Sequence, residues 1–326
     1  MKKAISILFI LSLFASMAAG QKITAMQGKV KDGYNFWLHE PEIKNVVDTT
    51  QKADTTIWKY LPKPEENVSC FDAHNVKCLE KEKDPNLKPL IIFLHGQSLC
   101  GTNLNRVMSY GTMAALKGGR KVDAYVVGPQ NPGGSWKPSK IANIMDWMIA
   151  NYPIDTDRIY VLGMSLGGYG TIDFVATYHD RIAAAMALCG GGTVKDYSGL
   201  CKVPLWIIHG TADRAVGVGE SRKVVKAMKE SGDTPLLRYD EWAGVNHGRL
   251  ARLFYLADTY TWLMSHSLAD SPRYVNTQID ITNQTLNNAY KDLKLSKGKS
   301  SKKKSSSKKK SSKRTLQTNL VCSNYS

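Results

Sequence analysis

The sequence lacks the short motifs that mark many nucleotide-dependent and metal-dependent enzymes. No Walker, GxGxxG or HExxH pattern stands in a suitable strand and helix context, so we expect no metal and no cofactor. After the N-terminal region, apolar runs long enough to span a membrane are missing as well. The composition, with 43% hydrophobic and 22% charged residues, excludes a wholly disordered, collagen-like or disulfide-only chain.

Acidic residues are absent from the segment Lys297 to Arg314, which holds ten Lys and Arg residues. This segment supplies most of the net charge of +16, and the rest of the chain is only mildly basic. A Lys/Ser-rich block cannot bury enough apolar surface to order itself, so we predict a disordered tail over residues 271–326. Two interpretations of the block 297–314 stay open: weak contact with polyanions through screened electrostatics, or a solvated segment without function.

The first twenty residues have the order of a secretory signal peptide. Lys2 and Lys3 precede an apolar run from Ala4 to Phe14, and a stretch of small residues ends at Gly20. The alternative is an uncleaved membrane anchor, but the apolar run is short for a span that needs about 20 residues. We therefore predict a secreted or periplasmic protein, with no stable membrane insertion after the leader 1–20 is removed.

Six cysteines remain after that cleavage, and export permits disulfides. Cys70 and Cys78 are close enough in sequence to close a small loop, and so are Cys189 and Cys201. Cys70, His74 and Cys78 also have a metal-like spacing, but a structural zinc takes four ligands and no second pair stands nearby. We therefore favour disulfides or free buried thiols, and the connectivity stays open.

Predicted strands alternate with stretches of helical spacing in the central part of the chain. Apolar side chains recur at helical spacing from Ile141 to Met148, for example, just before another apolar run. Such alternation predicts βαβ units and a doubly wound, mostly parallel α/β sheet. We expect one domain over residues 21–270, with a long polar excursion at 41–88. The predicted strands cover residues 34–38, 90–94, 124–127, 159–162, 183–188, 205–208 and 236–239.

The strongest motif is the run from Gly163 to Gly168, Gly-Met-Ser-Leu-Gly-Gly, between a predicted strand and a helical stretch that ends near Tyr178. A serine on a sharp turn from strand to helix is exposed above the sheet edge. Small residues two positions before and after Ser165 let the neighbouring backbone approach closely. The context indicates that Ser165 is a nucleophile.

A serine hydroxyl needs a base to take its proton, and the base needs an acid to orient it. Asp213 follows the predicted strand 205–208, and His247 follows the predicted strand 236–239. Both therefore lie at the sheet edge that carries Ser165, where open α/β sheets bind ligands. The order Ser, Asp, His is the one that this motif predicts. Asp240 and Glu241 compete for the acid role because they are nearer to His247 in sequence.

With these residues and the turn His95-Gly96-Gln97 after the strand 90–94, the chain resembles an α/β-hydrolase over residues 34–267. It looks like the small esterases of the phospholipase/carboxylesterase, dienelactone-hydrolase and polyhydroxybutyrate-depolymerase or feruloyl-esterase-like groups. The resemblance implies Ser165 as nucleophile, His247 as general base and Asp213 as its orienting acid. It also implies an oxyanion hole from Leu166 and Gln97, although Gln97 stands where lipase-type loops have glycine.

Other residues near the predicted edge have two interpretations each. Trp136 follows the strand 124–127 and is placed to line an acyl or alcohol pocket, or alternatively to pack on its own loop. His95 and His209 each precede a glycine at a strand end, so we expect them to support loop structure through hydrogen bonds.

The sequence therefore predicts an exported serine hydrolase that cleaves carboxylic esters through an acyl-enzyme. The short stretch between Ser165 and Asp213 leaves no room for a large cap domain, so we expect an open site for small-molecule or glycan esters, such as acetyl or feruloyl substituents on glycans. Two alternatives stay open: a prolyl-oligopeptidase-like serine peptidase with the same fold, and a non-catalytic protein that binds polyanions through the basic tail.

Overall fold

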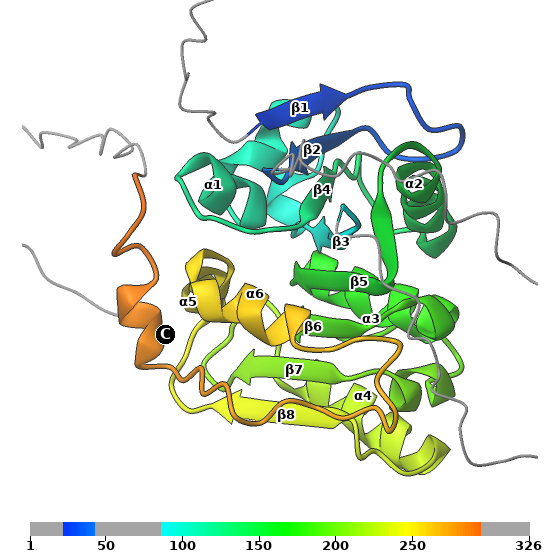
Figure 1. Ribbon diagram of the computed structural model, residues 1–326. Coiled ribbons are helices and arrows are strands. Elements are labelled where there is room, and N and C mark those ends of the chain that lie inside the picture. The colour runs from blue at the N-terminus through cyan, green and yellow to red at the C-terminus, as the bar shows by residue number, and fades with distance from the viewer. Residues whose placement is uncertain (1–21, 43–85, 295–326) are drawn as a thin grey trace, which may run out of the picture. The chain divides into compact units, whose positions relative to one another are not determined.

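The computed structural model describes residues 22–42 and 86–294, and these form an eight-stranded sheet (Figure 1). The strand order is β1-β2-β4-β3-β5-β6-β7-β8, with antiparallel pairing only for β1 with β2 and β2 with β4. The predicted doubly wound, mostly parallel sheet is therefore confirmed. The strands are β1 Lys22–Met26, β2 Phe36–Glu40, β3 Lys88–Leu94, β4 Tyr125–Pro129, β5 Ile154–Met164, β6 Ala184–Leu188, β7 Leu205–Gly210 and β8 Leu237–Trp242.

Helices cover both faces of this sheet, because its central strands are apolar on both sides. In β3, Ile91 and Phe93 face one hydrophobic cluster, with α1 and α6, whereas Leu90 and Ile92 face the other, with α2, α3 and α4. Helix α2 begins at a proline, which suits a first helical position. The helices are α1 Thr112–Lys117, α2 Pro138–Asn151, α3 Leu166–Tyr178, α4 Gly219–Ser231, α5 His247–Leu250 and α6 Ala257–Met264.

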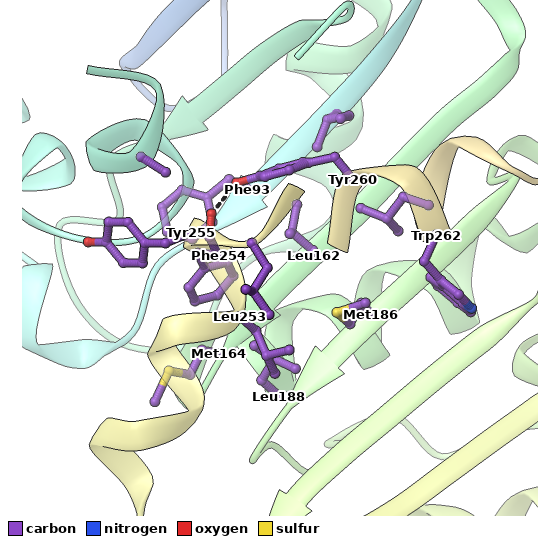
Figure 2. Packing of buried hydrophobic residues seen from close by; sticks show 14 of the residues in the cluster. Phe93, Leu162, Met164, Met186, Leu188, Leu253, Phe254, Tyr255, Tyr260 and Trp262 are labelled. Carbon is purple, nitrogen blue, oxygen red and sulfur yellow. Dashed lines mark hydrogen bonds between the residues drawn. The ribbon is translucent and has the colours of Figure 1, made fainter. Parts of the chain in front are cut away.

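Figure 2 shows the first of these clusters, in which strand side chains meet the segment 251–264. Phe93 packs edge-on against Phe254 with ring centroids 5.0 Å apart. The buried hydroxyl of Tyr260 donates a hydrogen bond of 2.5 Å to the Phe254 carbonyl, so the aromatic layer has no unpaired hydroxyl at this point. This packing holds α5 and α6 against the sheet and thereby fixes the position of the loop that carries His247.

The prediction that the tail begins at residue 271 is wrong for residues 271–294. Ile281, Leu286 and Ala289 are buried in the hydrophobic core. The Arg273 guanidinium donates hydrogen bonds to the carbonyls of Ile182, Ala183 and Lys202. The buried apolar residues of this segment are separated by Asn, Thr and Gln, so no helical or strand periodicity marks them as core. The block 297–314 lies outside the described residues.

The leader 1–20 and most of the polar excursion 41–88 also lie outside the described residues, as do Cys70, Cys78 and Cys322. Cys100, Cys189 and Cys201 are free thiols, so the candidate link between Cys189 and Cys201 is wrong. Among the residues that the structure describes, every helix is too short or too polar to cross a membrane.

Candidate active site

Ser165 occupies a sharp turn between the end of β5 and the start of α3. Its backbone angles are φ 59° and ψ −122°, a conformation that non-glycine residues rarely adopt and that costs about 1–3 kcal/mol. The Ser165 N–H donates to the Leu188 carbonyl at 2.9 Å, and its carbonyl accepts from the Tyr169 N–H at 3.0 Å. These bonds hold the serine in place at the carboxyl edge of the sheet.

The glycines on either side of Ser165 are required by close backbone contacts. A Cβ atom on Gly163 would lie 2.6 Å from the carbonyl carbon of Gly167, and one on Gly167 would lie 2.5 Å from the carbonyl carbon of Leu94. Real Cβ atoms are essentially never found so close, so neither position admits a side chain. The sequence-based prediction that small residues permit close approach here is confirmed.

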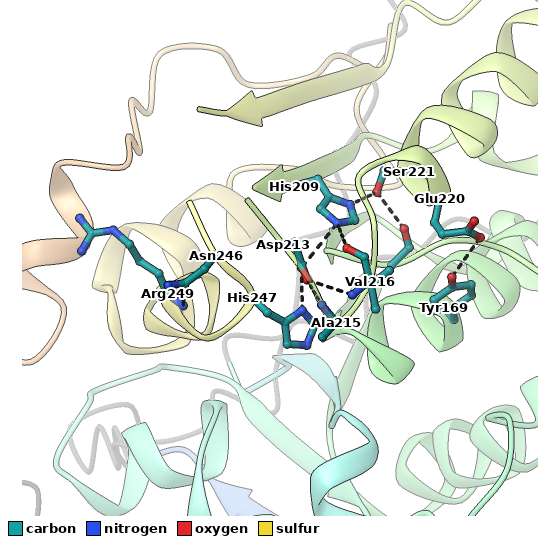
Figure 3. A network of polar contacts seen from close by, with 11 residues as sticks. Tyr169, His209, Asp213, Ala215, Val216, Glu220, Ser221, Asn246, His247 and Arg249 are labelled. Carbon is teal, nitrogen blue, oxygen red and sulfur yellow. Dashed lines mark hydrogen bonds and ion pairs between the residues drawn. The ribbon is translucent and has the colours of Figure 1, made fainter. Parts of the chain in front are cut away.

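His247 and Asp213 form a hydrogen-bonded pair at the same edge of the sheet (Figure 3). The Nδ1 atom of His247, the first residue of α5, lies 2.6 Å from Oδ2 of Asp213, which follows β7. The Asp213 side chain is fully buried, whereas the His247 side chain is 26% exposed. Nε2 of His247 has no hydrogen-bond partner among the described residues, so its lone pair is available when Nδ1 carries the proton.

Several hydrogen bonds keep Asp213 ionised despite its burial. Burial alone would raise the pKa of Asp213, but hydrogen bonds from the Val216 N–H, from His247 and from the Ala215 N–H outweigh that effect and lower the pKa below its usual value. Oδ1 accepts both backbone bonds, which leaves Oδ2 to His247. The carboxylate is therefore fixed in the orientation that holds a proton on Nδ1.

The two carboxylates that competed with Asp213 have other partners. Oδ2 of Asp240 accepts the indole N–H of Trp206 at 2.6 Å. Glu241 binds the Arg222 guanidinium through both oxygens, and hydrogen bonds from Arg222 and Tyr239 lower its pKa to about 2. Both carboxylates lie within β8, so neither is oriented toward the imidazole by a loop as Asp213 is.

The loop after β3 lies directly against the serine turn. A Cβ atom on Gly96 would lie 3.4 Å from the Ser165 Cβ. The Gly96 N–H is already bound by the Tyr110 hydroxyl at 2.8 Å, whereas the N–H of Gln97 has no acceptor among the described residues. The N–H of Leu166 opens α3 and has no acceptor within the helix. Within the described part of the chain, both backbone N–H groups predicted for an oxyanion hole therefore lack an acceptor.

His95 supports this loop from inside the protein, as predicted. Its Nδ1 donates to the Gly96 carbonyl at 2.8 Å, and its Nε2 accepts the Asn131 N–H at 3.1 Å. Both bonds are satisfied by one neutral tautomer. Burial lowers the pKa of His95 to about 4, which keeps the ring neutral at ordinary pH.

Trp136 does not line a pocket as its first interpretation predicted. It is 3% exposed, and its indole N–H donates to the His95 carbonyl at 3.2 Å. Its ring packs edge-on against His95 and Tyr34 and over Gly170, where a Cβ atom would lie 2.6 Å from the ring. The alternative interpretation, packing on the loop, describes the residue correctly.

His209 lies behind Asp213 in a second polar layer (Figure 3). Its Nε2 is 2.9 Å from the Val216 carbonyl and 3.5 Å from Oδ2 of Asp213, and its Nδ1 is 2.8 Å from Oγ of Ser221. The Ser221 hydroxyl also contacts the Gly190 carbonyl at 2.8 Å. The predicted loop-supporting role of His209 is therefore confirmed. Sequence reasoning missed Ser221, because a serine inside α4 carries no signal of its own.

Cys189 is a second residue that sequence reasoning missed at the site. It follows β6 at the same sheet edge, is fully buried and has a positive φ of 38°. Its sulfur, an Asp213 carboxylate oxygen and a His247 ring nitrogen all lie within 4.8 Å of one another. Burial and the Asp213 carboxylate raise the pKa of the Cys189 thiol, so it is protonated at neutral pH. Its place directly after a predicted strand could have indicated this position.

The sheet order, the strained turn at Ser165 and the histidine–carboxylate pair after β7 and β8 together show that the chain has the α/β-hydrolase fold. The predicted resemblance to that family is thereby confirmed. The fold is similar to that of a thermostable esterase of known structure, with a TM-score of 0.53 and 23% identity over 75% of this chain and 63% of that one. No protein-family model matches the chain.

Within that class, the chain is similar in sequence to curated esterases. Esterase Rv1288 of Mycobacterium tuberculosis is 25% identical over 174 residues, which are 53% of this chain and 32% of that protein. The bifunctional acetylxylan esterase/xylanase XynS20E of Neocallimastix patriciarum is 29% identical over 160 residues, 46% of this chain and 23% of that protein. The matched part thus spans about a third or less of the length of these relatives.

Proposed function

We propose that this protein is a serine esterase that hydrolyses carboxylic esters through an acyl-enzyme. The observation that carries the proposal is the pairing of His247 with Asp213 at 2.6 Å, at the edge where Ser165 occupies a strained turn, with Nε2 of His247 free of partners in the described part of the chain. A buried carboxylate that fixes the imidazole tautomer is the arrangement that a general base for a serine hydroxyl requires. The sequence similarity to esterases supports the ester as the bond cleaved.

In the proposed reaction, Oγ of Ser165 attacks the ester carbonyl while Nε2 of His247 takes the hydroxyl proton. The resulting oxyanion accepts hydrogen bonds from the N–H groups of Gln97 and Leu166, and Asp213 stabilises the imidazolium. His247 then returns the proton to the departing alcohol, which leaves an acyl group on Ser165. Water, activated by the same histidine, releases the acid and restores the serine.

We further propose that the alcohol part of the substrate is a glycan. A hollow of about 210 Å³ lies between the edge strand β1, its neighbour β2 and the segment 102–105, and its lining includes Gln27, Asn103 and Asn105. Uncharged amide side chains both donate and accept hydrogen bonds, which suits sugar hydroxyls. Because β2 lies three strands from β5, the hollow is roughly 14 Å from the serine strand across the sheet, a span that an oligosaccharide can bridge.

The place of action is also proposed as extracellular or periplasmic. The support for export is the order of charged, apolar and small residues in positions 1–20 of the sequence. A glycan ester substrate is consistent with that location.

The experiment that tests the proposal is hydrolysis of p-nitrophenyl acetate, butyrate, octanoate and ferulate by the wild-type protein and by Ser165→Ala. Ser231→Ala, at the exposed end of α4, is the matched control. We expect the rate of Ser165→Ala to fall by about 10³-fold or more and that of the control to stay near wild type. Equal, negligible rates in all three proteins on every ester would refute the esterase proposal.

A further inference from the structure

The proposed reaction uses two of the three metal-ligating side chains that meet beside Ser165. Cys189 comes from the end of β6, Asp213 from the loop after β7 and His247 from the start of α5. One ligand atom of each lies within 4.8 Å of the other two. The proposed reaction gives the Cys189 thiol no role, although its sulfur lies beside the acid and the base.

The three ligand atoms are those that a soft divalent cation prefers. Zn²⁺ is bound in proteins by thiolate sulfur, imidazole nitrogen and carboxylate oxygen, at about 2.3 Å for sulfur and 2.0 Å for nitrogen. In a tetrahedral site these lengths put the ligand atoms roughly 3.5 Å apart. Ligand atoms at the 4.8 Å limit of the cluster need to approach by about 1.3 Å, whereas Nδ1 of His247 and Oδ2 of Asp213, 2.6 Å apart, need to separate by about 0.9 Å. Three protein ligands leave a fourth position for water.

Hard cations do not fit this set. Mg²⁺ and Ca²⁺ take six or more oxygen ligands, and the cluster offers a single carboxylate beside a thiol and an imidazole. The approach for a cation is on the His247 side, because that side chain is 26% exposed whereas the Asp213 side chain is fully buried. Among the described residues no other group of three such side chains is found.

We propose that Cys189, Asp213 and His247 form a binding site for a thiophilic divalent cation of the Zn²⁺ type, and that the bound cation switches hydrolysis off. The inhibitory part rests on the proposed esterase function, whereas the binding part does not. The site is regulatory because its ligands include the acid and base of the reaction, so that metal binding and catalysis exclude each other.

The binding step balances without any redox change. The cation takes the place of the proton between Nδ1 of His247 and Oδ2 of Asp213, and these two atoms, 2.6 Å apart, separate to admit it. The Cys189 thiol releases its proton to solvent, and the imidazole proton moves from Nδ1 to Nε2. An imidazole that is metal-bound on Nδ1 and protonated on Nε2 has no lone pair for the Ser165 hydroxyl proton, so it cannot act as the base.

The binding part is tested by titrating ZnCl₂ alone into the full-length Ser165→Ala protein in the calorimeter, with and without the additional change Cys189→Ser. Serine keeps the size of the side chain but removes the thiolate. Cys201→Ser, a half-buried thiol whose hydrogen-bond partner is the Met228 carbonyl, is the matched control. We expect Cys189→Ser to raise the Kd for one equivalent of zinc by at least about tenfold, and the control variant to leave that Kd unchanged. Equal affinity and stoichiometry in all three proteins would overturn the proposal.

A second variant covers the case in which Cys189→Ser fails to fold. His247→Asn removes a ligand that is partly exposed. We expect it to raise the Kd for the same equivalent of zinc by a similar factor. Co²⁺ offers an independent readout, because a thiolate ligand gives it a sulfur-to-metal charge-transfer band. We expect His247→Asn to need at least about tenfold more Co²⁺ to reach half of that band, and an unchanged titration curve would contradict the assignment.

The inhibitory part is tested on p-nitrophenyl acetate hydrolysis, with the rate of each protein normalised to its own value in chelator. We expect Zn²⁺ to inhibit the wild type and Cys201→Ser at the same concentration. Inhibition of Cys189→Ser should need a Zn²⁺ concentration at least about tenfold higher. Mg²⁺ should leave the rate of all three proteins unchanged. Full activity of the wild type with zinc bound would overturn the inhibition. If the wild type shows no hydrolysis at all, the esterase function fails while the calorimetric result on zinc binding still stands.

Discussion

The Tyr110 hydroxyl accepts the backbone N–H of Gly96 at 2.8 Å. This bond occupies the Gly96 N–H, whereas the Gln97 N–H has no acceptor among the described residues, so Gln97 is the residue whose N–H the loop after β3 can offer to a substrate. Tyr110 comes from a separate segment between η3, Leu104–Ser109, and α1. The loop is thus held from outside by a side chain that itself carries no part of the proposed proton transfer.

Removing that bond should impair the proposed oxyanion hole without removing a catalytic group. We expect Tyr110→Phe to lower kcat for p-nitrophenyl acetate about tenfold, with little change in KM, because a loosened loop lowers stabilisation of the transition state more than binding of the ester. Tyr274→Phe, whose hydroxyl binds the Ser265 carbonyl at an exposed position, is the control. A decrease in kcat no larger than that of the control would contradict the positioning role.

Substitutions at Asp213 and Asp240 test which of the two carboxylates orients His247. Asp213→Asn should lower kcat/KM by about 10³-fold or more, because an amide no longer stabilises the imidazolium or holds the proton on Nδ1. Asp240→Asn should stay within about threefold of wild type, since Asp240 binds Trp206 rather than His247. The measurement is steady-state hydrolysis of p-nitrophenyl acetate, and comparable losses in both variants would remove Asp213 from the proposed triad.

The serine turn should tolerate no side chain at Gly167. Gly167→Ala places a Cβ atom against the Leu94 backbone, so we expect a loss of about 3 kcal/mol or more in the free energy of unfolding, or failure to fold. Gly217→Ala serves as the control, because nothing lies within 4 Å of a Cβ atom there, and it should stay within about 0.5 kcal/mol. Urea unfolding followed by tryptophan fluorescence measures both, and a stable Gly167→Ala protein would show that the turn relaxes.

Acid should destabilise the protein through its buried histidines. Burial lowers the pKa of His95 from 6.5 to about 4 in the folded state, so between these values the unfolded chain binds more protons. The stabilisation is therefore complete above pH 6.5 and is lost as the pH falls toward 4, by about 3 kcal/mol for this group. Burial also lowers the pKa of His39, His209 and His266, so their effects have the same sign.

His95→Asn isolates the contribution of that histidine. We expect the variant to be less stable than wild type at pH 7 but to lose less of its remaining stability between pH 6.5 and 4.5. Urea unfolding at several pH values gives both slopes. Parallel slopes in the two proteins would show that His95 does not change its protonation on folding.

The hollow beside β1 should matter for long substrates only. We expect Asn105→Ala to raise KM for an acetylated xylo-oligosaccharide about fivefold relative to KM for p-nitrophenyl acetate, because a short ester does not extend to the hollow. Asn151→Ala, at the exposed end of α2, is the control. An unchanged ratio of the two KM values in Asn105→Ala would exclude the hollow as a glycan subsite.

Most of the sheet was predictable from the sequence because buried parallel strands are continuously apolar. The run Ile159 to Leu162 indicated β5, and the motif after it located the serine turn. The strand β1 was missed because its five residues, Lys22–Met26, are exposed or half-buried at the sheet edge and carry no apolar run. Hydrophobic patterning therefore cannot predict a strand that is hydrogen-bonded into the sheet but has few buried side chains.

The positions of the site residues were predictable only where the end of a predicted strand determines them. Asp213 and His247 follow neighbouring parallel strands, so the topology alone brings their loops together. The burial of Trp136 and the approach of Cys189 to Asp213 depend instead on tertiary contacts, which sequence spacing does not encode. The strand ends place all three ligands of the proposed zinc site at one sheet edge, but the distances between their side chains depend on those tertiary contacts.

The segment 271–294 completes the core that α1 and α6 share. Leu286 and Ala289 pack into that core, and the Lys294 N–H donates to the Gly118 carbonyl at 2.8 Å, so the last described residue is bonded to a turn in the first half of the chain. All eight strands precede this segment in sequence, so one face of the sheet receives the last part of its apolar covering from residues that are synthesised after the whole sheet. Truncation before this segment would remove Leu286 and Ala289 from that core and leave the apolar side chains beneath them uncovered.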